Sequence, residues 1–112
     1  MMRYHAHVYF DVAQIQVIEA LYAQLQHDFG DTLDYGRIHQ KLVGPHTKPM
    51  FQLAFDQDIL PALHVFLNMH VAVTSVLIHP LHDNEYLAHT QDAQWVGEVL
   101  PLRLDIFNQS AL

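Results

Sequence analysis

Cysteine is absent from this sequence of 112 residues, and basic residues are few. Without cysteine the chain can form no disulfide, and it can hold neither an iron–sulfur cluster nor a zinc ion through thiolates. Five basic residues stand against twelve acidic ones, a formal net charge of −7 with histidine neutral. Because a nucleic-acid-binding protein needs a basic surface to meet the phosphates, we expect no nucleic acid partner.

Long apolar runs are also missing. No run approaches the roughly 20 residues that a membrane helix needs. The first residues, MMRYHAHVYF, lack the pattern of a secretory signal. We therefore expect no membrane partner and a cytoplasmic location. Hydrophobic residues still make up 51% of the chain, enough for a core, so we expect residues 1–112 to form a single folded domain.

Histidine is the residue that the sequence has in excess, with ten copies. Imidazole is a common ligand of divalent metals, and its protonation changes near neutral pH. An excess can therefore indicate a metal site, acid–base chemistry or only a solvated surface. The positions of the histidines in the fold have to distinguish these interpretations.

The first part of the chain predicts a strand followed by a helix. Over residues 4–10, apolar side chains alternate with histidine and tyrosine, which is typical of a strand with one face on the core. Asp11 and Gln14 have the spacing of a capping box. An apolar stripe then runs to Gly30, so we expect a helix between the cap and this glycine.

The remaining segments predict an α+β fold. We expect strands over 35–43, 49–55 and 73–79, a helix over 58–70, and a turn at GPHTKP, residues 44–49. The order of elements, β-α-β-β-α-β, favours a ferredoxin-like antiparallel sheet with both helices on one face and the spatial strand order 4-1-3-2.

Two segments are additions to this ferredoxin-like core. Residues 81–97 are polar and predict an irregular or partly helical insertion. After Pro101, apolar and polar side chains alternate over residues 102–107, which predicts an additional C-terminal strand.

Three histidines converge in this predicted sheet. His5 and His7 lie about 6–7 Å apart on the face of the first strand opposite Ala6 and Val8, which should pack on the helices. The fourth strand runs antiparallel beside the first, so His79 at its end should approach His5. We therefore predict His5, His7 and His79 as ligands of one metal ion. A solvated polar face is the alternative.

Three further side chains are candidates for the same site. Glu85 and His89 share a face if residues 83–89 are helical, and a carboxylate beside two histidines would form the facial triad of non-haem iron(II) proteins. A surface charge is the simpler interpretation of Glu85. His46 can reach the cluster only if its turn folds over the open sheet face or comes from a partner subunit. Open sheet faces often pair, so we predict a homodimer.

Four segments resemble the DOPA 4,5-dioxygenase family, and together they cover nearly the whole chain. They are YHAHVYFD (4–11), GPHTKPMFQLAF (44–55), LIHPLHDNEYLAHTQDAQWVGE (77–98) and LPLRLDIF (100–107). The resemblance implies a dimeric ferredoxin-like fold and a metal-dependent extradiol dioxygenase, which cleaves the ring of DOPA or another catechol with O2. The implied cofactor is non-haem Fe(II). In the purified protein, zinc or another divalent metal can occupy the same site.

The resemblance also assigns residues. It places five histidines on the family's histidine positions: His5, His7, His46, His79 and His89. Ala88 stands where the family has an acidic residue, which puts a role for that position in doubt. His46 and His89 are our candidates for removing and returning a catechol proton. Tyr9, Gln52 and Lys48 are candidate substrate contacts, with ordinary sheet surface as their alternative.

Three functions follow from these candidates. The first is an Fe(II) extradiol dioxygenase. The second is a non-catalytic module that binds a metal or a small aromatic molecule, since one fold hosts many functions. The third is a hydrolase or isomerase that uses zinc in the same pocket.

Overall fold

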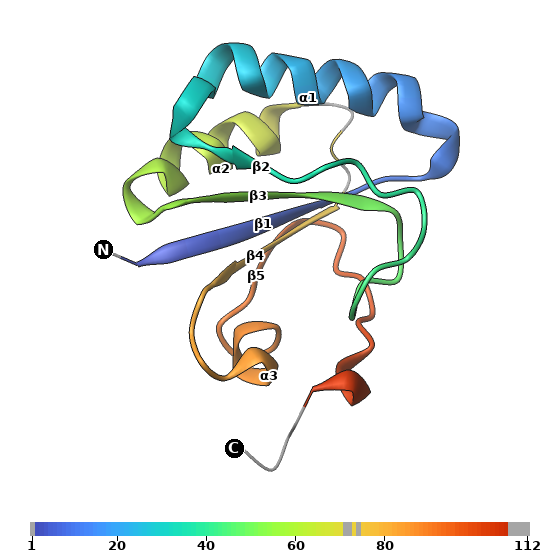
Figure 1. Cartoon of the computed structure of the whole chain (residues 1–112), viewed down its shortest axis with the longest axis vertical. Helices are drawn as coiled ribbons and strands as arrows, with labels where there is room; N and C mark the ends of the chain where they lie inside the picture. The colour runs from blue at the N-terminus through green and yellow to red at the C-terminus, as the bar shows by residue number, and fades with distance from the viewer. Residues whose placement is uncertain (1, 71–72, 74, 108–112) are drawn as a thin grey trace.

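A computed structural model describes residues 2–70, 73 and 75–107 of the protein. Its strands form one antiparallel sheet in the order β2-β3-β1-β4-β5. The strands are β1 (Arg3–Tyr9), β2 (Asp34–Tyr35), β3 (Met50–Asp56), β4 (Ser75–Pro80) and β5 (Gln94–Gly97). Two helices, α1 (Ile15–Phe29) and α2 (Leu60–Met69), lie on one face of the sheet, and the short α3 (Glu85–Ala88) lies beyond the other face (Figure 1).

The α+β class is confirmed, as is an antiparallel sheet. Strands β2, β3, β1 and β4 are neighbours in the order that the sequence predicted. The fourth strand was expected from residue 73, but part of that start lies outside the described residues, and β4 begins at Ser75. Within the described ranges, no helix is long and apolar enough to cross a membrane.

Helix α1 begins and ends as its sequence predicts. The backbone N–H of Asp11 donates a hydrogen bond of 3.0 Å to Oε1 of Gln14, so the capping-box pair does close the entry to the helix. Residues 12–14 form a 3-10 turn before the helix proper. Gly30 ends the helix with a φ of +51°, a conformation that glycine adopts at little cost.

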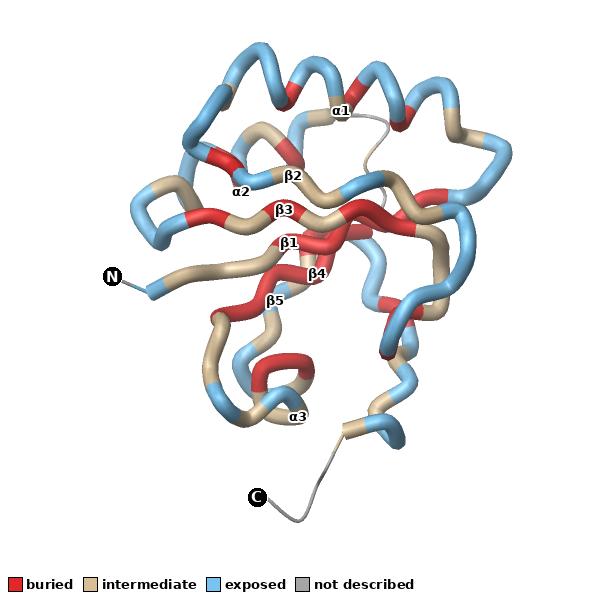
Figure 2. The backbone as a smooth tube through the Cα atoms, viewed as in Figure 1, coloured by how far each residue is buried: buried red, intermediate tan, exposed pale blue. Residues whose placement is uncertain are grey.

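The two faces of the sheet bury different side chains. Ala6 and Val8 of β1 are fully buried in the main apolar core, together with residues of α1 and α2. The opposite face carries a smaller apolar cluster, which contains Tyr9 and Leu77. Figure 2 shows buried backbone running along the middle strands, between the helical layer and the loops on the other side.

One predicted strand is much shorter than expected, and another is absent. The second strand is only Asp34–Tyr35, followed by an isolated bridge between His39 and Met50. Its expected apolar members Leu42 and Val43 are instead exposed, so no sheet face holds them. The predicted strand over 102–107 is an irregular segment with a 3-10 turn, because β5, within the insertion, already occupies that edge beside β4.

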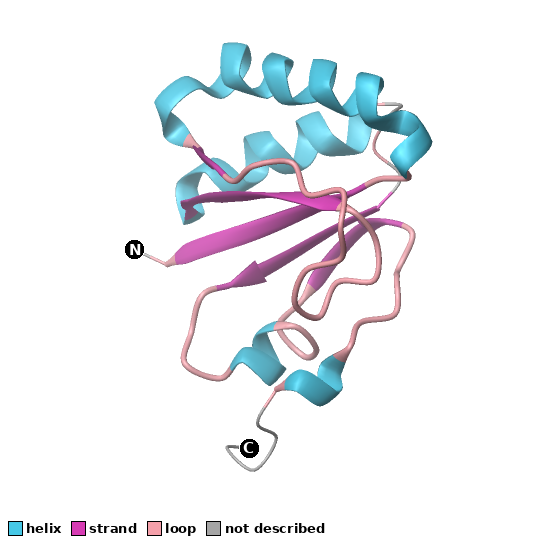
Figure 3. Cartoon of the chain, turned by 45° about the vertical axis from the view of Figure 1, so that its right-hand side comes forward, coloured by secondary structure: helices cyan, strands magenta, loops and turns pink. Residues whose placement is uncertain are grey.

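The expectation of an open sheet face is also wrong. The chain covers that face itself with α3, the segment 100–107 and the turn 44–49 (Figure 3). Two hydrogen bonds tie the turn to the C-terminal segment: Oγ1 of Thr47 donates to the carbonyl of Pro101 at 2.6 Å, and the N–H of Arg103 donates to the carbonyl of Pro45 at 2.7 Å. Side chains on this face are therefore enclosed within one chain.

Candidate active site

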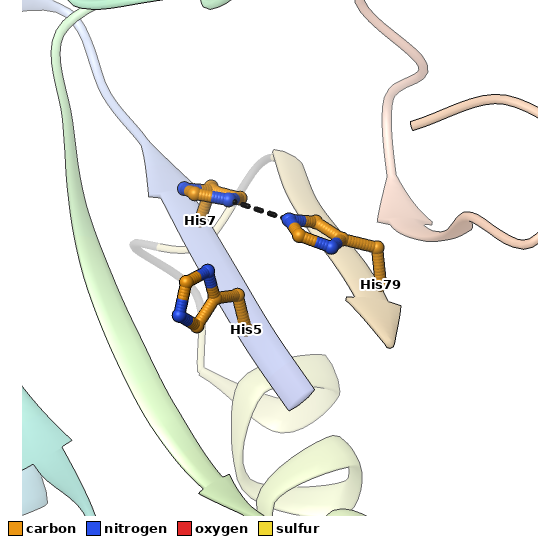
Figure 4. A group of neighbouring side chains, drawn as sticks. All are labelled: His5, His7 and His79. Atoms are coloured by element: carbon orange, nitrogen blue, oxygen red, sulfur yellow. Dashed lines mark hydrogen bonds between the residues drawn. The ribbon is translucent and has the colours of Figure 1, made fainter. Parts of the chain in front are cut away.

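Strands β1 and β4 bring three histidines together on the face away from α1 and α2. His5 and His7 alternate with Ala6 on β1, and His5 lies directly opposite His79 of β4 in the antiparallel pairing. The Nε2 atoms of His7 and His79 are 3.0 Å apart (Figure 4). The ring of His5 lies 5.8 Å from that of His7 and 5.4 Å from that of His79. The predicted convergence is therefore present.

Two more histidines close over this group. The turn 44–49 brings the His46 ring to 4.1 Å from the His7 ring, and α3 brings the His89 ring to 4.2 Å from the His79 ring. His7, His46, His79 and His89 are each at most 6% exposed. Because His46 arrives from the same chain, its presence in the cluster needs no partner subunit.

Backbone carbonyls orient two of these rings. Nδ1 of His79 donates to the carbonyl of Pro80 at 3.0 Å, and Nδ1 of His89 donates to the carbonyl of Glu85 at 2.8 Å. A carbonyl oxygen only accepts, so Nδ1 carries the hydrogen in both rings. In each neutral ring the lone pair is therefore on Nε2, where it can bind a metal or accept a proton.

Burial favours the neutral form of four histidines of the cluster, His5, His7, His46 and His79. It lowers the pKa of His79 to about 3 and the pKa of His46 to about 4. The pKa of His7 lies well below its ordinary value for the same reason, with the neighbouring imidazoles adding to the effect. Burial also lowers the pKa of His5. Neutral imidazole is the form that binds metal ions.

The donor set fits a divalent metal. The donor atoms of His5, His7 and His79 all lie within 4.8 Å of one another, and those of His7, His46 and His89 do likewise, so His7 belongs to both groups. Two nitrogens held at right angles on one ion, each about 2.1 Å from it, would be roughly 3.0 Å apart. That matches the separation of His7 Nε2 and His79 Nε2.

The other ring nitrogen of His7 has no partner in the described part of the chain. Nδ1 of His7 is buried and has no hydrogen-bond partner among the described residues. Buried polar atoms without a partner are uncommon in folded proteins. One imidazole cannot direct both of its nitrogens at one ion, so an ion beside Nε2 of His7 would leave this atom facing away from it. Borderline metals such as iron(II) and zinc suit an all-imidazole set.

A cavity of about 220 Å³ opens beside the cluster. All five histidines line it, together with Gln52 of β3 and the apolar side chains Met50 and Phe107. The Phe107 ring lies 4.8 Å from the His89 ring at an angle of 31°, and so forms one wall next to that histidine. The volume is smaller than the range of about 300–1,000 Å³ that is usual for drug-sized ligands.

Comparisons with known proteins identify the family. The family model described as the Dopa 4,5-dioxygenase family matches residues 4–106. The chain belongs to this family. It is also similar to a protein of Nostoc punctiforme, provisionally named a dioxygenase, whose crystal structure superposes with a TM-score of 0.85. The two are 30% identical, over 94% of this chain and 90% of the other. No curated protein matches this chain.

Membership of a dioxygenase family makes the histidine cluster the candidate active site. The other residues that the sequence predicted for this site differ in whether they line its cavity. Gln52 lines the cavity. Tyr9 is 1% exposed and does not line it. Lys48 points elsewhere, because its Nζ is 3.2 Å from Oδ1 of Asp11. Glu85 lines the cavity, but its side chain is 59% exposed, and its Oε2 lies 3.8 Å from Nδ1 of His89.

Sequence reasoning missed part of this dioxygenase-family site. Phe107 was expected in the strand over 102–107 and Met50 in the strand over 49–55, yet both line the cavity. Nothing local in the sequence marks either residue, because each reaches the site through the packing of a distant segment. Ala88, where the family resemblance expects an acidic residue, is buried, so no carboxylate stands beside His89 at that position.

Proposed function

We propose that this protein is a metal-dependent extradiol dioxygenase that cleaves a catechol ring with O2, and that His5, His7 and His79 hold its Fe(II). The 3.0 Å approach of His7 Nε2 and His79 Nε2 carries the proposal, because both imidazoles are buried and burial lowers the pKa of each. Membership of the Dopa 4,5-dioxygenase family supports the oxygen chemistry. A catechol is a single small ring, and the cavity of about 220 Å³ suits a ligand of that size.

The other residues of the cavity have distinct tasks in this proposal. Fe(II) would supply a common binding point for the catechol oxygens and for O2, and a path for electrons between them. His89 accepts a catechol proton, because its Nδ1 is held by the carbonyl of Glu85 and its Nε2 has a free lone pair. Gln52 orients the substrate, and Phe107 and Met50 exclude water from the ring. His46 is the second acid–base candidate.

The reaction is an oxidation of the substrate. The carbon–carbon bond beside the diol breaks, both atoms of O2 enter the product, and the ring opens to a conjugated acid with an aldehyde or ketone group. The substrate itself supplies the electrons that reduce O2, so no external reductant is required. The proton that His89 takes from the catechol returns during ring opening, so the protons also balance.

Anaerobic reconstitution tests this proposal. Protein loaded with Fe(II) without air, and then mixed with a panel of catechols in air, should consume one O2 for each catechol and form a yellow ring-opened product. The zinc-loaded protein is the matched control and should form none. Tight binding of catechols without O2 consumption would instead support a non-catalytic module for small aromatics, and zinc-dependent turnover without O2 would support a hydrolase or isomerase.

We also propose a ferredoxin-like homodimer. The argument from an open sheet face does not apply, because the chain covers that face. The family resemblance remains, and Leu42 and Val43 are exposed apolar side chains, of which Val43 also lines the cavity. Sedimentation velocity should therefore show a species of about twice the mass of 12.9 kDa. A monomer at micromolar concentration would contradict the dimer without touching the proposed reaction.

A further inference from the structure

The hydroxyl of Tyr9 has one hydrogen-bond partner among the described residues, Nδ1 of His46, at 2.6 Å. Tyr9 is at the end of β1, two residues after His7, and His46 is in the turn that folds over the sheet face. The contact therefore joins the strand that carries the predicted metal ligands to the loop that closes the cavity.

Apolar packing holds the Tyr9 ring in place. The side chain is 1% exposed and belongs to the small apolar cluster on the site face, with Leu77 and Leu100. Its ring stacks on Trp95 of β5 with centroids 6.0 Å apart and an angle of 20°. A ring fixed in this way presents its hydroxyl in one direction only, toward His46.

The direction of the hydrogen bond follows from counting hydrogens. A phenol at neutral pH has one hydrogen to donate, and a neutral imidazole has a hydrogen on only one of its nitrogens. If Nδ1 of His46 donated to Tyr9, the buried O–H of Tyr9 would have no acceptor among the described residues. An unmade buried hydrogen bond is costly, so the favoured arrangement has Tyr9 donating to Nδ1.

We propose that Tyr9 is a positioning residue that fixes His46 in the tautomer with its hydrogen on Nε2. His46 lines the cavity, and with Nδ1 engaged by Tyr9 it offers the cavity a hydrogen-bond donor. It then has no free lone pair with which to bind the metal or act as a base, which leaves His5, His7 and His79 as the ligand group. Within the proposed function, on which this step rests, His46 donates to a substrate oxygen while His89 accepts the proton.

Nitrogen NMR reads this tautomer directly. Long-range proton–nitrogen correlation spectra of protein labelled with ¹⁵N-histidine show which ring nitrogen carries the hydrogen, and His46→Gln assigns the signals. In the metal-free wild type and in the zinc-loaded protein we expect the hydrogen of His46 on Nε2. A hydrogen on Nδ1, or a His46 nitrogen bound to zinc, would overturn the inference.

Two variants sharpen the test. Tyr9→Phe retains the packed ring and removes the hydroxyl, so the His46 signals should move toward the other tautomer or an average of the two. Tyr4→Phe is the matched control on the same strand, because the Tyr4 ring lies on the opposite face of the sheet, against Phe55. This variant should leave the His46 signals unchanged. Unmoved His46 signals in folded Tyr9→Phe would also overturn the inference.

Kinetics separate the inference from the proposed function. If the protein cleaves catechols, Tyr9→Phe should lower kcat by about 10- to 100-fold, the loss usual for a residue that orients another, with iron content unchanged and KM within about twofold. If no catechol is cleaved but His46 has its hydrogen on Nε2, the proposed function fails and the tautomer assignment stands. If the protein cleaves catechols but His46 has its hydrogen on Nδ1, the tautomer assignment fails and the proposed function stands.

Discussion

The variant His7→Ala is expected to lose stoichiometric binding of Fe(II) and zinc, and with it all ring cleavage. His7 belongs to both groups of donor atoms, and its Nε2 lies 3.0 Å from Nε2 of His79. We expect metal affinity to fall by more than about 100-fold, beyond the 10- to 100-fold cost of losing a residue that only orients a ligand. Metal analysis after dialysis and a metal titration by calorimetry would measure the loss.

The matched control for this substitution is His27→Ala. The His27 side chain is 83% exposed on α1, and its hydrogen-bond partner is Asp28, so its removal should leave metal content unchanged. His7→Gln provides a larger replacement in case alanine leaves a cavity that destabilises the sheet. If either folded His7 variant retains one metal per chain, the assignment of His7 as a ligand is incorrect.

Acid should destabilise the metal-free protein well before its carboxylates titrate. Burial lowers the pKa of His46 to about 4 and that of His79 to about 3, whereas both titrate near 6.5 once unfolded. In the window below 6.5 the unfolded chain therefore binds more protons, so the free energy of unfolding falls as the pH falls. Between about pH 8 and about pH 5 we expect a loss of about 2 kcal/mol for each of these two histidines.

Urea unfolding of the metal-free protein at several pH values would measure this loss. His79→Gln removes one of the two groups, so the decrease in its unfolding free energy over the same window should be smaller by about 2 kcal/mol. His27→Gln, which changes an exposed histidine, should retain the wild-type decrease. A free energy of unfolding that stays constant from about pH 8 to about pH 5 would show that His46 and His79 are not buried and neutral in solution.

The first strand shows how much local pattern can predict. Alternation over residues 4–10 assigned Ala6 and Val8 to the helix face and His5 and His7 to the other, and the structure agrees. One antiparallel neighbour then placed His79 beside His5. This succeeded because side chains on a strand repeat every two residues, so a single assignment of faces determines all of them.

The same kind of pattern misled at two other segments. Leu42 and Val43, and the residues after Pro101, alternate or are apolar like strand residues, but the described structure offers no sheet edge to either segment. Strand β5 is only Gln94–Gly97, too short for alternation to stand out, and it took the edge beside β4. Which segment pairs at an edge depends on competition between distant parts of the chain.

The sequence by itself determined the class of fold, the faces of β1, the neighbourhood of His5, His7 and His79, and, through its resemblance to a family, the kind of chemistry to expect. Only the tertiary structure decided that the site face is covered and that His46 joins the cluster from the same chain. It also decided that Tyr9 contacts His46, whereas Lys48 pairs with Asp11. The reason is that strand periodicity is a local property. The path of a loop over a sheet depends on contacts such as Thr47 with Pro101, between residues far apart in the chain.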